Sequence, residues 1–269
     1  MMTWENYRSI QWKGICLVAS VCFICGSAHA ADNLEELLAR TSRQASAFLQ
    51  QFSEVKCTEK VAQEKLNKDG KVERAAESTS DYLVILSNTG GELSLNESRL
   101  ALHEAKTDKQ KTSLLVSNGF ATLFLVFHPH YADSFQFTAD ADEQLSGHLM
   151  RIVTFKHIRG TRSPAALSLR NREYPLELSG KAWIDPQSGS IAKMVTTVGS
   201  TMEDVGLKTM DSEVDYTPIV FHDLPQTYWF PVKATVEVET PRQHWRNTHL
   251  FSDYKLFSVS TDEKVANNK

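Results

Sequence analysis

The sequence predicts a mainly β protein, in which a single curved antiparallel sheet forms an unclosed barrel with an N-terminal helix and one or two helices across the opening. Three observations predict this fold. About ten strand-like segments follow one another at spacings of roughly 8–15 residues. An amphipathic helix precedes them, and a short apolar stripe with helical spacing interrupts them midway. No linker, low-complexity segment or repeat divides the chain.

The first 30 residues have the pattern of a secretory signal peptide. Arg8 and Lys13 give a positive n-region, an apolar run from Gly14 to Gly26 follows, and Ala28-His29-Ala30 matches an A-x-A cleavage site. The run is shorter than the ~20 residues that a membrane span needs. The cysteines in this segment lack the preceding small residue that lipoprotein processing expects. We expect cleavage between Ala30 and Ala31 and a periplasmic or secreted mature protein; the alternative is an uncleaved membrane anchor.

The mature chain is expected to form one domain, residues 31–258, followed by a polar tail, residues 259–269. The whole sequence has 29 basic and 33 acidic residues, a net charge of −4, which is not the basic surface that a nucleic-acid partner requires. Three of the four cysteines lie in the leader, so the mature chain has no internal disulfide. We expect the remaining one, Cys57, to be a small buried side chain on a strand; the alternative is a reactive thiol or an intermolecular bridge.

Residues 34–52 have the spacing of one helix face. The residues on that face recur at intervals of four and three: Leu34, Leu38, Thr41, Ala45, Phe48 and Phe52. Asp32 or Asn33 is the expected N-cap, because its side-chain oxygen can accept a free backbone N–H. The apolar face of this helix should lie on the sheet.

Strand patterns follow the helix. Residues 55–66 have period-two character, and Asp69-Gly70 is a tight-turn signal. Residues 82–86 are apolar on both faces, which predicts cover on both sides. A turn is predicted at residues 185–189, where proline fixes φ and glycine accepts a positive φ. The clearest strand, residues 232–240, alternates apolar with polar residues and should have one dry and one wet face.

A second helix is predicted within residues 114–127, with a strand as the competing interpretation. Four apolar residues occupy positions i, i+3, i+4 and i+7: Phe120, Leu123, Phe124 and Phe127. We expect this stripe to lie across the concave side of the sheet. The four residues, together with Val236 on the dry face of the clearest strand, are the candidate ligand contacts. They form either the wall or lid of an apolar pocket or a plug of the core.

Catalytic motifs are missing from the sequence, which has no nucleophile elbow, metalloprotease helix or nucleotide-binding glycine pattern. His128 and His130 could share a side of an extended segment, but a third metal ligand at useful spacing is missing, so we expect them to be solvated or capping. His249 and Asp253 lie in a strand pattern, where residues four apart are too distant to hydrogen-bond directly. We therefore expect no catalytic residue, no metal site and no cofactor.

The order of the elements resembles the periplasmic carriers that sort outer-membrane lipoproteins, the LolA/LolB type, and related sigma-factor regulator domains of the same fold. The resemblance rests on the helix of residues 34–52 leading into strands, and on the segments 176–191, 228–236 and 252–257. The segment 158–173 departs from the family pattern, and no lipid-gating residue of the family can be placed on this sequence.

The resemblance implies a monomeric, non-enzymatic periplasmic binding protein for an acyl chain, a lipid or a lipoprotein. Two alternatives stay open. One is an envelope sensor or scaffold of the same fold, which contacts an envelope protein and carries no ligand. The other is a hydrolase with an unrecognised site, which would need a nucleophile and a base brought together by folding.

Overall fold

The computed structural model describes residues 26–89, 92–103, 119–169, 172–198, 202, 206–222 and 227–256. Its strands are β1 (Val55–Leu66), β2 (Val72–Thr89), β3 (Glu92–His103), β4 (Phe135–Ala139), β5 (Glu143–Leu145), β6 (His148–His157), β7 (Ala166–Leu169), β8 (Arg172–Pro175), β9 (Leu178–Ile184), β10 (Ile191–Val198), β11 (Thr209–Val220), β12 (Thr227–Glu239) and β13 (His244–Leu256). Its helices are α1 (Gly26–Ser53), the 3-10 helix η1 (Phe120–Phe127) and α2 (Pro129–Ala132).

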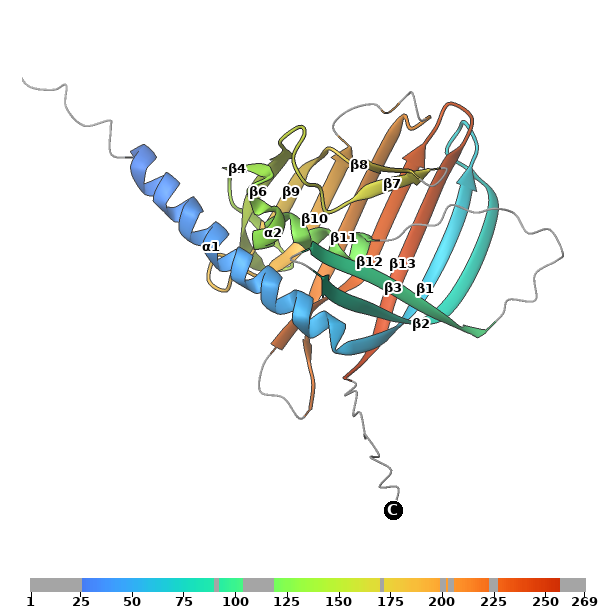
Figure 1. Cartoon of the computed structure of the whole chain (residues 1–269), viewed down its shortest axis with the longest axis horizontal. Helices are drawn as coiled ribbons and strands as arrows, with labels where there is room; N and C mark the ends of the chain where they lie inside the picture. The colour runs from blue at the N-terminus through green and yellow to red at the C-terminus, as the bar shows by residue number, and fades with distance from the viewer. Residues whose placement is uncertain are drawn as a thin grey trace, which may run out of the picture.

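One antiparallel sheet makes up most of the molecule. Its strand order is β3-β2-β1-β13-β12-β11-β10-β9-β6-β4, with β5 paired to β6. Within the described residues the edge strands β3 and β4 do not pair with each other, so the sheet curves without closing. Figure 1 shows α1 and the short helices η1 and α2 lying along one side of this curved sheet. The predicted fold, a single unclosed β-barrel with helices across its opening, is confirmed.

Helix α1 covers one end of the concave face through its predicted apolar stripe. Ala45, Phe48 and Phe52 are buried on it, and the helix contacts β1, β2, β12 and η1. The expected N-cap at Asp32 or Asn33 is wrong, because in the full-length chain the helix already begins at Gly26. The expected cleavage site therefore lies inside the helical segment, and cleavage after Ala30 stays a prediction. Among the described residues, no helix has the length and apolar character to cross a membrane.

The predicted mid-chain helix is present as η1, but it is a 3-10 helix instead of an α-helix. Gly119 precedes it with a φ of 81°, a left-handed conformation that glycine adopts without strain. His128 ends it in an extended conformation, as expected for a residue before proline. Side chains from Leu123 to Phe127 are all buried, so the segment is enclosed on every side. The predicted part before Gly119 lies outside the described residues.

The strand predictions are confirmed for β1 and β12, whose burial alternates along the chain. The predicted cover on both faces of residues 82–86 is wrong. Tyr82 and Val84 are buried on the core side, but Ile85, on the opposite face of β2, is 50 % exposed. Strand β3, at that edge, was not among the predicted strands. The unusual segment 158–173 contributes to the separate hairpin β7-β8, which Figure 1 shows in front of the main sheet.

Candidate functional site

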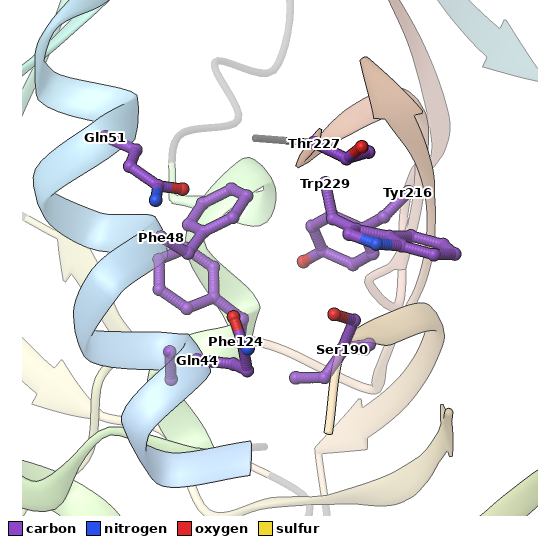
Figure 2. Close-up of a pocket in the computed structure, with 10 residues that line it drawn as sticks. Gln44, Phe48, Gln51, Phe124, Ser190, Tyr216, Thr227 and Trp229 are labelled. Atoms are coloured by element: carbon purple, nitrogen blue, oxygen red, sulfur yellow. The ribbon is translucent and has the colours of Figure 1, made fainter. Parts of the chain in front are cut away.

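A pocket opens between α1, η1 and the strands β10, β11 and β12. Its lining residues are Gln44, Ala45, Phe48, Gln51, Phe124, Ser190, Ile191, Tyr216, Thr227 and Trp229. The free space is about 460 Å³, counting the part that is open to solvent. Figure 2 shows Phe48 and Phe124 on the helix side facing Tyr216 and Trp229 on the strand side.

The helix side of the pocket is a packed aromatic surface. The rings of Phe48 and Phe124 are 4.2 Å apart between centroids. Phe48 also meets Tyr216 edge-on at 6.1 Å and Phe230 at 5.6 Å. Tilted and edge-on contacts of this kind are favourable for aromatic pairs. Apolar rings therefore form the inner wall, and polar side chains complete the lining.

The turn before β10 fixes α1 relative to the pocket. Arg40 on α1 donates from Nη2 to the carbonyl oxygen of Pro186 at 3.1 Å. Gly189 has a φ of 77°, and a Cβ built on it would lie 2.8 Å from the backbone nitrogen of Thr41. Only glycine allows this close approach. The predicted turn at residues 185–189 is confirmed, and Ser190 and Ile191, which follow it, line the pocket.

The polar groups around the pocket are amides and hydroxyls. Gln51 and Thr227 lie toward one end in Figure 2, and Gln44 and Ser190 toward the other. The Tyr216 ring is buried, and burial raises the pKa of its hydroxyl, although the Phe124 backbone acts in the opposite direction. This hydroxyl thus stays protonated and is available as a hydrogen-bond donor at neutral pH.

The predicted site residues are brought together only in part. Leu123, Phe124 and Phe127 are each at most 4 % exposed, and of these only Phe124 lines the pocket. Val236 is fully buried in the core and does not line it. The side chain of Phe120 lies outside the described residues. Whether any of these five residues binds a ligand stays a prediction.

Most of the pocket wall was not predicted from the sequence. Phe48 belonged to the predicted stripe of the first helix, and that stripe was its signal. Trp229 stands in an aromatic run before the clearest strand, next to the buried Tyr228 and Phe230. No local signal marks Tyr216 as a pocket residue, because its position there depends on how β11 pairs with β12.

A second unusual feature is a buried ion cluster on the concave face, made of Glu59, Glu97, Arg99 and His249. Glu59, on β1, is fully buried. Its Oε2 accepts from Nε of Arg99 at 2.5 Å, and its Oε1 accepts from Nη2 of Arg99 at 2.9 Å. Nδ1 of His249 lies 2.8 Å from the same Oε1. Glu97 pairs with Arg99 at 2.9 Å.

The neighbours of Glu59 keep its carboxylate ionised. Burial acts to raise the pKa of Glu59, but the hydrogen bonds from His249 and Arg99 outweigh it, so the pKa lies below its ordinary value. Glu97 also accepts the backbone N–H of Gly119 at 2.7 Å, which connects the cluster to the residue before η1. The carboxylate that His249 contacts is therefore Glu59, and the expected separation of His249 from Asp253 stays a prediction.

The residues that the sequence suggested for metal binding or thiol reactivity have structural roles. Nδ1 of His128 accepts the backbone N–H of His130 at 3.1 Å, which is the expected capping role. Within the described residues, no group of three or more histidine, cysteine, aspartate or glutamate side chains is arranged to hold a metal ion. Cys57 is buried on β1 as expected, and burial raises its pKa to about 12. Its thiol is therefore protonated at neutral pH and is a poor nucleophile.

Among known proteins, this chain is similar only to solved structures. No family model matches the chain, and no curated protein matches it. A domain described as an outer membrane lipoprotein-sorting protein domain from Vibrio parahaemolyticus is 10 % identical, with 87 % of this chain and 95 % of that chain covered and a TM-score of 0.40. A DUF1329 family protein from Desulfovibrio piger is 10 % identical, with 84 % and 95 % covered and a TM-score of 0.42. Values this low do not establish a family or a function for this chain.

Proposed function

We propose that this protein is a non-enzymatic, extracytoplasmic binding protein for an apolar ligand that carries an acyl chain. The signal-peptide pattern of the first 30 residues supports its export. The observation that carries the proposal is the aromatic pocket between α1 and the open sheet, with Phe48 and Phe124 facing Trp229. Concave sites lined by apolar rings with a few polar groups are typical of sites for hydrophobic small molecules.

Trp229 offers a direct test, because it lines the pocket. A brominated acyl chain quenches tryptophan fluorescence at close range. The exported protein has two other tryptophans: Trp245 is buried on β13, and Trp183 lies under the amino group of Lys193, 5.5 Å from its ring. A brominated acyl ligand in the pocket should therefore quench mainly Trp229.

The matched variant is Trp229→Phe, which keeps an aromatic ring in the wall. We expect saturable quenching of the natural protein and loss of most of that quenching in the variant. Native mass spectrometry of the purified exported protein should also detect copurified lipid. If neither saturable quenching nor bound lipid is found, the binding proposal fails, and a sensor or scaffold without a carried ligand takes its place.

A further inference from the structure

The polar side chains of the pocket have a common property that bears on the class of ligand. Among the described residues that line it, every polar side chain is uncharged: Gln44, Gln51, Ser190, Tyr216 and Thr227. An ionised carboxylate or phosphate drawn into this space would meet no cation among these lining side chains. Burial of an unpaired charge costs far more than burial of a neutral polar group that finds a hydrogen bond.

The Tyr216 hydroxyl is the group that most needs a partner. Its side chain lines the pocket, the residue is only 6 % exposed, and its oxygen makes no hydrogen bond of normal geometry within the described structure. The Phe124 backbone, which lowers the pKa of this hydroxyl, can act on the oxygen only as a donor, so the hydroxyl hydrogen is left without an acceptor. In Figure 2 this oxygen points into the space between the sheet and α1. Buried polar groups in folded proteins nearly always have a hydrogen-bond partner. An orphaned donor that points into a pocket therefore indicates a site where a bound molecule supplies the acceptor.

We propose that the pocket selects amphiphiles whose polar end is a neutral acceptor, an ester or amide carbonyl, and that Tyr216 donates its hydroxyl hydrogen to that carbonyl. This inference rests on the proposed function. The amides of Gln44 and Gln51 on α1 offer further N–H donors along the other side of the pocket. A free fatty acid would have to leave its carboxylate in water at the mouth and would make no use of the Tyr216 hydroxyl.

The test compares two ligands with the same brominated acyl chain, the free acid and its methyl ester, both delivered from cyclodextrin at about pH 8. Quenching of Trp229 gives a Kd for each. The ester is also the more hydrophobic ligand, so the informative quantity is the ratio of the two Kd values in the natural protein and in Tyr216→Phe. Loss of one hydrogen bond should weaken ester binding by roughly three- to tenfold. The Kd of the acid should stay the same.

Two controls separate recognition from damage to the fold. Tyr82→Phe removes another buried tyrosine hydroxyl on a side chain that does not line the pocket, and it should leave the ratio unchanged. Tyr216→Phe should leave the ligand-free unfolding midpoint nearly unchanged, because the hydroxyl hydrogen has no acceptor within the described residues. An unchanged ratio in Tyr216→Phe, or tighter binding of the acid by the natural protein, overturns the inference and leaves the proposed function standing. Absence of quenching by both ligands overturns the two together.

Discussion

The buried ion cluster allows a quantitative test of how the two ends of the chain are held together. Glu59 on β1 is fully buried and is bonded to Arg99 on β3 and His249 on β13. Glu59→Gln keeps the shape of the side chain and removes its charge. Removal of one partner of a buried ion pair usually costs about 3–5 kcal/mol. Because the Arg99 side chain is 28 % exposed and keeps Glu97, we expect the lower end, about 3 kcal/mol of unfolding free energy at pH 7.

Glu64 provides the matched control on the same strand. It also pairs with an arginine, at 2.8 Å from Arg246, but its side chain is 26 % exposed on the outer face. Exposed pairs contribute about 0–1 kcal/mol, so Glu64→Gln should have a small effect. Urea denaturation monitored by circular dichroism measures both variants. Equal costs for the two substitutions would show that burial does not strengthen the cluster and would refute the reasoning.

The same pair of variants tests the pH dependence. The pKa of Glu59 is lowered on folding, so the stabilisation that it contributes is present above the ordinary glutamate value of roughly 4.3. It is lost as the pH falls through the lowered value in the folded protein, where the protonated side chain resembles glutamine. The gap in stability between the natural protein and Glu59→Gln should therefore narrow as the pH falls below about 4.3. A gap that stays constant as the protein is acidified, up to the point where it unfolds, would contradict the assignment of the ionised carboxylate.

Three further outcomes follow from particular residues. Val236→Asp should lower the free energy of unfolding by several kcal/mol, because it places an unpaired charge in the core. Glu237→Ala, on the other face of β12, should change that free energy by no more than about half a kcal/mol. Chemical denaturation measures both, and equal effects would mean that the two faces are misassigned. Gly189→Ala should lower the melting temperature, because its Cβ would meet the α1 backbone at 2.8 Å; an unchanged value would show that the helix can shift. N-terminal sequencing of the exported protein should begin at Ala31, and a lipidated N-terminus at a leader cysteine would contradict this.

Local patterns predicted much of the fold. Alternation of apolar and polar residues marked β12, and helical spacing marked α1 and η1, because each depends on which side of one element meets the core. Residues 82–86 show the limit of that reasoning. Their composition suggests two buried faces, but only one face of β2 packs against the core, and Ile85 on the other face is 50 % exposed. Which face of a strand other elements cover is not a local property of its sequence.

The sequence by itself determined the class of fold, the buried state of Cys57 and the aromatic character of the α1 stripe, since these depend on spacing and side-chain chemistry. Only the tertiary structure decided where the pocket lies and what holds Glu59. The pocket needs α1, η1 and three strands to converge, and the contact between Glu59 and His249 joins residues 190 positions apart. That contact exists because β13 returns to pair with β1. Strand order is set by the free energy of packing the whole sheet, and no segment of the sequence contains it alone.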